Sequence, residues 1–112
     1  MKINIRESGD VRIVHLAGSL DANTSITAET MIHQLLDAGI TKIIINLDKT
    51  EYISSAGLRV LLSTTKRISA GKGRFILCQP NPAVYRILEI SGFLAILDVK
   101  TTEADALAEI SG

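Results

Sequence analysis

The chain has 112 residues, of which 46% are apolar, and it carries 12 basic and 12 acidic side chains. This length is typical of one domain, and it is enough to bury a core without disulfides. A formal net charge of zero argues against non-specific nucleic-acid binding, and the aromatic content of 4% disfavours stacking of single-stranded bases. We therefore expect a single domain over residues 1–112 with no direct contact to nucleic acid.

Cysteine usage and hydropathy predict the compartment. The one cysteine, Cys78, cannot form an intramolecular disulfide, and its place in the apolar run 75–78 indicates a buried thiol. The first residues alternate between apolar and polar, without the apolar stretch of a signal peptide. The longest apolar run, 93–97, is far shorter than the ~20 residues that span a bilayer. We expect a cytoplasmic protein with no membrane span.

The N-terminal residues predict an antiparallel hairpin. Ile3 and Ile5 alternate with polar residues, a turn follows at 8–10, and a second strand is expected over 11–17. His15 lies in that second strand. We interpret it as structural, because no second ligand stands at metal-binding spacing.

A loop over residues 18–23 should lead into the first helix. Thr24 is the expected N-cap and Gly39 the C-terminal stop. His33 is expected on the solvated side of this helix. The predicted apolar face consists of Ile26, Met31, Ile32, Leu35 and Leu36.

The middle of the chain predicts a buried strand followed by a helix. The β-branched run 42–47 is typical of a central strand, and residues 48–51 are expected to be a solvated connection. The helix should run from about Ser55 to Ala70 and end at the glycines of 71–73. Its apolar face is predicted to comprise Leu58, Leu61, Leu62 and Ile68, with Thr65 between them.

The C-terminal third continues the alternation. A strand over 74–78 precedes Asn81-Pro82, a cap followed by proline at the first helical position. A short strand is expected over 96–99, and Thr102 should cap the last helix. The third helix should end at Gly92 and turn four side chains inward: Val84, Ile87, Leu88 and Ile90.

Strands that alternate with helices predict an α/β fold. We expect a mixed sheet of about five strands, with an edge hairpin followed by largely parallel strands, packed with about four helices. Ser54 and Ser55 then fall near the carboxyl end of a central strand, where ligands and chemistry gather in such folds.

The two adjacent serines admit two interpretations. Ser54 or Ser55 can simply cap the helix, which is the usual role of a serine at a helix start. Alternatively, one hydroxyl is presented for chemistry, because one serine is enough for a cap. Ala56 and Gly57 make a small first turn that leaves room for another surface. Gly57 lowers helix stability by about 1 kcal/mol relative to alanine, so helix stability is not its purpose.

Five stretches of the chain form one pattern in order and spacing: Gly18-Ser19-Leu20-Asp21-Ala22-Asn23-Thr24, Asn46-Leu47, the run 52–62, Asn81-Pro82-Ala83-Val84 and Ser91-Gly92-Phe93. Taken together, these stretches resemble the anti-sigma factor antagonists, the STAS-domain phosphoproteins of bacterial partner-switching systems. The resemblance covers nearly the whole chain and departs from the family pattern where Ser54 replaces an aspartate and where Ala56 follows Ser55.

The resemblance implies a single STAS-type domain that binds an anti-sigma factor, which is also a serine kinase, and so releases a sigma factor. Phosphorylation would fall on Ser55, with Ser54 as second choice, and would abolish binding until a serine phosphatase restores the hydroxyl. Asp21 also has a simpler interpretation as a turn residue. The partner-binding residues implied are Asp21, Asn23, Thr24, Ser54, Ala56, Gly57 and Arg59.

A second hypothesis is a STAS scaffold or sensor, in a stressosome-like assembly or with a small ligand, that acts on a target other than a sigma factor. We do not expect an enzyme, a cofactor or a metal. Ile53 stands where a nucleophile elbow needs glycine, and both histidines precede the serine. No phosphate-binding Walker loop is present, and Asp48 alone does not make the acidic cluster of a receiver domain.

Overall fold

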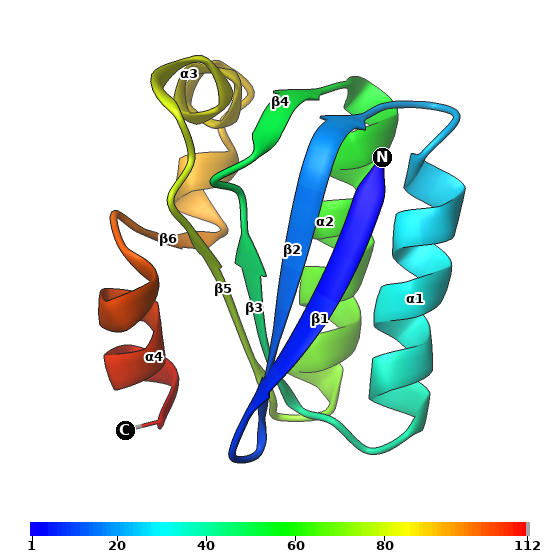
Figure 1. Cartoon of the computed structure of the whole chain (residues 1–112), viewed down its shortest axis with the longest axis vertical. Helices are drawn as coiled ribbons and strands as arrows, with labels where there is room; N and C mark the ends of the chain where they lie inside the picture. Colours follow the sequence, from blue (N-terminus) through cyan, green and yellow to red (C-terminus); the bar gives the residue numbers. More distant parts are fainter. Residues whose placement is uncertain (112) are drawn as a thin grey trace.

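In the computed structural model, which describes residues 1–111, strands and helices alternate after an initial hairpin (Figure 1). The elements are β1 (Lys2–Ser8), β2 (Val11–Leu20), α1 (Ser25–Asp37), β3 (Lys42–Asn46), β4 (Thr50–Ile53), α2 (Ser55–Ala70), β5 (Arg74–Cys78), α3 (Pro82–Ile90), a 3₁₀ turn η1 (Phe93–Ala95), β6 (Asp98–Lys100) and α4 (Glu103–Ser111).

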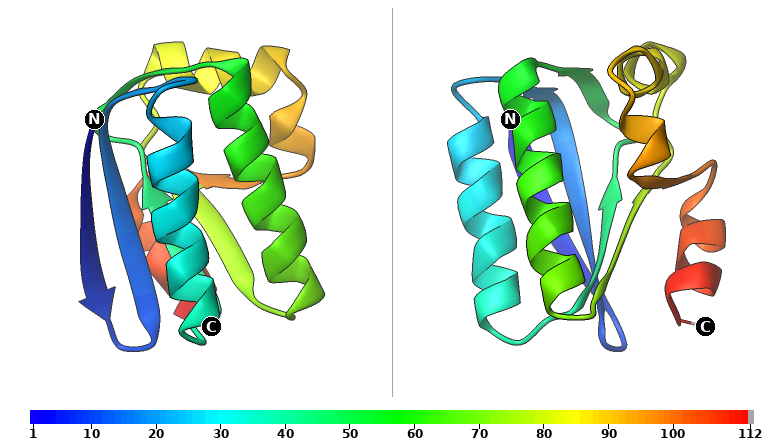
Figure 2. Two further views of the ribbon diagram at one scale, coloured as in Figure 1. Left: turned by 90° about the vertical axis from the view of Figure 1, so that its right-hand side faces the viewer. Right: turned by 180° about the vertical axis from the view of Figure 1, so that it is seen from behind.

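The sheet runs in the order β1-β2-β3-β5-β6, and β4 pairs with the far end of β2. Among the strand pairs formed by residues 1–111, only β1–β2 is antiparallel, and the other pairs are parallel. Helices α1 and α2 lie side by side on one face, whereas α4 lies on the other (Figure 2). The predicted α/β class, the edge hairpin, the parallel strands that follow and the four helices are all confirmed.

Two apolar clusters hold the layers together. The larger one lies between the sheet and the helices α1 and α2, and it includes Val14, Ile45 and Leu61. The smaller one joins Ile44 on the opposite face to Ile110 in α4. Because β3 is covered on both faces, its residues are apolar without alternation, as is usual for a parallel central strand.

Three predictions about strands were wrong. The strand β2 does not end at residue 17 but continues to Leu20, and residues 50–53 form β4 rather than part of a solvated connection. Thr50 is fully buried, and its hydroxyl donates a 2.6 Å hydrogen bond to the Leu16 carbonyl. The polar composition of residues 48–51 concealed this strand. The last strand is also shifted to Asp98–Lys100, so that Ile96 is exposed.

Two predicted inward-facing isoleucines point to solvent instead. Ile26 is 72% exposed at the start of α1, and Ile90 is 70% exposed at the end of α3. Both lie in a terminal turn of their helix. His33 is also misassigned, because it is half-buried and its Nε2 lies 3.4 Å from Ser63 Oγ.

Most predicted helix ends are confirmed. Asn81 Oδ1 accepts a 2.8 Å hydrogen bond from the Val84 amide, and Thr102 Oγ1 accepts one of 3.1 Å from Asp105. Gly39 has a φ of +93°, which a residue without a side chain adopts readily, and it ends α1. None of the helices within residues 1–111 is both long and apolar enough to cross a membrane.

The two groups predicted to be structural do lie in structural surroundings. Cys78 is fully buried, and burial raises the pKa of its thiol to about 12. His15 is half-buried, and its Nε2 accepts a 3.0 Å hydrogen bond from Arg6 Nε. Burial, with the nearby Arg6 charge, lowers the pKa of His15.

Candidate functional site

The two serines at the start of α2 have different surroundings. Ser54 is the N-cap, with an extended backbone, and its Oγ accepts a hydrogen bond from the Gly57 amide at 3.3 Å. Ser55 is the first residue of the helix and is exposed. Its hydroxyl makes no hydrogen bond within the part of the chain that the structure describes. Ser54 therefore meets the capping need of α2, and the Ser55 hydroxyl is free for another role.

The end of β2 holds the start of α2 in place. The Ser54 amide donates a 2.9 Å hydrogen bond to the Leu20 carbonyl. A Cβ added at Gly57 would lie only 2.6 Å from the same carbonyl oxygen and 2.9 Å from Ile53 Cγ2. Gly57 is thus required because the first turn of α2 lies directly on β2. The expectation that Gly57 leaves room for a partner was wrong, since the protein's own backbone fills that space.

The loop that follows Leu20 is organised around Asp21. Its Oδ1 accepts hydrogen bonds from the amides of Asn23 at 2.9 Å and Thr24 at 3.1 Å, and these bonds lower the pKa of the Asp21 carboxyl. Thr24 does not cap α1 with its side chain, contrary to our prediction. Its hydroxyl instead donates a 2.7 Å hydrogen bond to the Ser19 carbonyl. The turn role considered for Asp21 is therefore the one that its contacts support.

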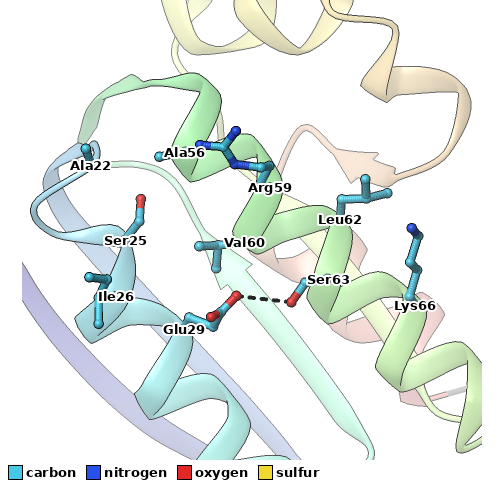
Figure 3. Close-up of a pocket in the computed structure, with 10 residues that line it drawn as sticks. All are labelled: Ala22, Ser25, Ile26, Glu29, Ala56, Arg59, Val60, Leu62, Ser63 and Lys66. Atoms are coloured by element: carbon cyan, nitrogen blue, oxygen red, sulfur yellow. Dashed lines mark hydrogen bonds between the residues drawn. The ribbon is translucent and has the colours of Figure 1, made fainter.

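A groove of about 560 Å³ runs between α1 and α2 beside the serines (Figure 3). Ile26 and Glu29 line it from α1, and Arg59 and Val60 line it from α2. Figure 3 shows the Arg59 guanidinium beside Ala56, in the turn that carries Ser55. The remaining lining residues are Ala22, Ser25, Ala56, Leu62, Ser63 and Lys66.

A serine and a histidine do meet in this fold, although not as a catalytic triad. Ser63 Oγ donates a 3.2 Å hydrogen bond to Glu29 Oε2 and lies 3.4 Å from His33 Nε2. In a triad the carboxylate would orient the imidazole, whereas here it accepts from the serine itself. Within residues 1–111, no group of three or more His, Cys, Asp or Glu side chains is placed to hold a metal.

The structure brings the segment 18–24 and the start of α2 together, because the Leu20 carbonyl accepts a hydrogen bond from the Ser54 amide. Asn23 and Arg59 are exposed, Asp21, Thr24, Ser54 and Ala56 are half-buried, and only Gly57 is buried. Sequence reasoning missed Ser25, which lines the groove. Its buried position could have been found, since Ser25, Ala28 and Ile32 recur at helical spacing and form the buried face of α1.

The chain also resembles known proteins over nearly its full length. The STAS domain family matches residues 2–106. BtrV of Bordetella bronchiseptica is 32% identical over 108 residues, which cover 96% of this chain and 93% of that protein. The anti-sigma F factor antagonist of Paenibacillus polymyxa is 31% identical over 115 residues, covering 98% of this chain and 95% of that protein.

Solved structures give the same result for the fold. The anti-sigma factor antagonist SpoIIAA in its unphosphorylated form superposes with a TM-score of 0.85 at 23% identity, covering 99% of this chain and 97% of that one. The phosphorylated form of the Bacillus protein gives a TM-score of 0.76 at 22% identity, covering 97% and 99%. The chain therefore belongs to the STAS domain family, a family of regulatory rather than typically enzymatic domains, and has relatives named anti-sigma factor antagonists.

Proposed function

We propose that this protein is an anti-sigma factor antagonist whose unphosphorylated form binds an anti-sigma factor and thereby releases a sigma factor. Phosphorylation of Ser55 by the same partner, acting as a serine kinase, ends the interaction, and a serine phosphatase reverses it. The observation that carries the proposal is the division of roles between the serines. Ser54 caps α2, so the exposed Ser55 hydroxyl can react without loss of the helix cap.

The surroundings of Ser55 favour a phosphate within the domain. The first intrahelical bond of α2 runs from the Leu58 amide to the Ser54 carbonyl, so the Ser55 amide has no carbonyl partner inside the helix. Phosphoserine carries about −1.5 to −2 charges at pH 7, and a helix N-terminus stabilises negative charge. Arg59 lies one turn further along α2, at the spacing that lets side chains meet. We expect the fold to tolerate the modification.

The same phosphate acts differently on a bound partner. An interface that covers Ser55, Asn23 and Arg59 must desolvate the phosphate, and an acidic partner group that would otherwise pair with Arg59 meets a like charge. Like charges opposed across an interface cost several kcal/mol, and each 1.4 kcal/mol changes affinity tenfold. A loss of affinity of about a hundredfold or more therefore needs no refolding.

Phosphorylation in vitro tests the proposal. The protein is incubated with the anti-sigma factor kinase of its own organism and ATP, the site is mapped by mass spectrometry, and the affinity of each form is measured by calorimetry. Ser55→Ala should remain folded, bind the kinase and stay unmodified. Ser54→Ala is the matched control and should still be phosphorylated on Ser55. Modification of Ser54 with Ser55 untouched, or equal affinity of both forms, would contradict the proposal.

A further inference from the structure

The hydroxyl of Ser25 is a buried polar group without a partner. The residue is 5% exposed, and its Oγ makes no hydrogen bond among residues 1–111. A hydroxyl that is desolvated in this way is destabilising, so an unpaired one needs an explanation. Ser25 lines the groove between α1 and α2, and Figure 3 shows its oxygen pointing toward the end where Ala22 and Ala56 lie.

The charges that face the groove favour an anion with a single charge. Arg59 and Lys66 face it from α2, and Glu29 faces it from α1. The Glu29 carboxylate accepts from Ser63, so one of its oxygens is engaged. The N-termini of α1 and α2 both lie at the end where Ser25 and Ala56 are found, and each contributes partial positive charge. The sum is modestly positive, which suits a monoanion better than a phosphate of higher charge.

The walls of the groove favour an apolar chain on that anion. Ile26 is 72% exposed, and it lines the groove together with Val60 and Leu62 (Figure 3). A volume of about 560 Å³ lies within the usual range of small-molecule sites. Arginine presents a planar pair of donors that matches a carboxylate. A simple inorganic anion would leave the apolar walls uncovered.

We propose that the groove between α1 and α2 is a binding site for a small carboxylate that carries a short apolar chain. The carboxylate pairs with Arg59 and accepts a hydrogen bond from Ser25, and the chain lies against Ile26 and Val60. The inference goes beyond the proposed function and does not depend on it. Because Ala56 belongs to the turn that carries Ser55 and Arg59 lies one turn further along α2, an occupied groove would also alter the surface that a partner meets.

The test uses the protein alone. Isovalerate is titrated into the ¹⁵N-labelled protein, and 3-methylbutan-1-ol, which has the same carbon skeleton without the charge, serves as the ligand control. We expect saturable shifts of the Ser25 and Ala56 amide signals, with half-saturation at millimolar concentration, and no saturation with the alcohol. Arg59→Gln should weaken binding about tenfold, and Ser25→Ala should weaken it severalfold. Glu29→Gln should strengthen it.

Two matched variants show that the effect belongs to the groove. Arg67→Gln removes an α2 arginine that pairs with Asp37, and Ser69→Ala removes an exposed α2 serine, and neither residue lines the groove. Both should bind isovalerate as the parent does. No saturable shift up to about 50 mM isovalerate, or binding unchanged in Arg59→Gln and Ser25→Ala, would overturn the proposal. Equal binding of inorganic phosphate, or tighter binding of leucine, would overturn the assigned ligand class.

Discussion

The starts of α1 and α2 lie side by side, yet different groups accept hydrogen bonds from the free backbone amides at each start. Helix α2 is capped in the usual manner, with the Ser54 side chain accepting from the Gly57 amide. At α1 the residue in the N-cap position, Thr24, has a helical backbone and makes no capping bond. There the Asp21 side chain accepts hydrogen bonds from two amides of the loop, and the Asp21 backbone carbonyl accepts one of 2.8 Å from the Ser25 amide.

The difference teaches that residue type alone does not decide the role of a hydroxyl at a helix start. Within the described residues 1–111, three such serines have three different roles: Ser54 is a cap, Ser55 is exposed without a hydrogen bond, and Ser25 is buried without a partner. The end of β2 is the common element, because Leu20 sits under the first turn of α2 and leads into the Asp21 loop.

The largest expected effect comes from the contact between Leu20 and α2. Gly57→Ala places a Cβ 2.6 Å from the Leu20 carbonyl oxygen, so α2 must shift away from β2. Overpacking of this kind costs about 1–3 kcal/mol, and we expect that loss in the free energy of unfolding measured with urea. Gly71→Ala is the control, because its Cβ would meet nothing closer than 3.7 Å. Equal stability of the two variants would show that α2 does not rest on Leu20.

The next effect concerns the cap itself. Ser54→Ala removes the acceptor of the Gly57 amide, and loss of a serine cap typically costs about 1 kcal/mol. Ser54→Asp keeps an acceptor and adds a charge that suits a helix N-terminus, so its stability should equal or exceed that of the parent. Urea unfolding of the three proteins decides between these expectations. A Ser54→Ala variant as stable as the parent would mean that another group caps α2.

The α1 start should be weakened by acid instead. The amides of Asn23 and Thr24 lower the folded-state pKa of Asp21, so its contribution is present above the unfolded pKa of about 3.9 and is lost as the pH falls through the folded value. Asp21→Asn retains an amide oxygen that can accept the same bonds but does not titrate. We expect the melting temperature of the variant to fall less than that of the parent when the pH is lowered from 5 to 2. If the melting temperatures of the parent and the variant fell by the same amount with pH, this role of Asp21 would be contradicted.

These helix starts also show how far the sequence predicts the site. Local signals identified the α2 start, since the paired serines stand directly at the start of the helix. They did not identify β4, the strand that directly precedes the serines. They failed where a distant segment decides the outcome. Gly57 is glycine because of Leu20, and nothing near Gly57 in the sequence reveals that contact. The role of Thr24 was misjudged for a different, local reason, since its hydroxyl donates to the Ser19 carbonyl five residues earlier instead of capping α1.

The fold, like the site, was predicted where local patterns decide the structure and missed where a tertiary contact decides it. The apolar strands and capped helices gave the α/β class, the edge hairpin and the four helices. Strand β4 was missed because its residues are largely polar and it pairs only with β2, at a point where β2 itself continues past Gly18. Gly18 has a φ of +110°, which glycine adopts readily. When only the sequence is known, a glycine at this position suggests a loop rather than a strand. The pairing of β2 with β4 joins segments that are far apart in the sequence, so no local pattern predicts it.

The smallest expected effects separate the two serines that do not cap. Ser55→Ala removes an exposed hydroxyl without a hydrogen bond, and it should change the free energy of unfolding by less than about 0.5 kcal/mol. Ser25→Ala removes a buried hydroxyl that has no partner, so it should leave the stability unchanged or raise it, because no hydrogen bond is lost. Urea unfolding measures both, and Thr64→Val is the contrast, since the buried Thr64 hydroxyl donates a 2.8 Å bond to the Val60 carbonyl. If Ser25→Ala lost about 1 kcal/mol or more, its hydroxyl would have a structural partner after all, and the groove would lose the unpaired group on which its assignment as a ligand site depends.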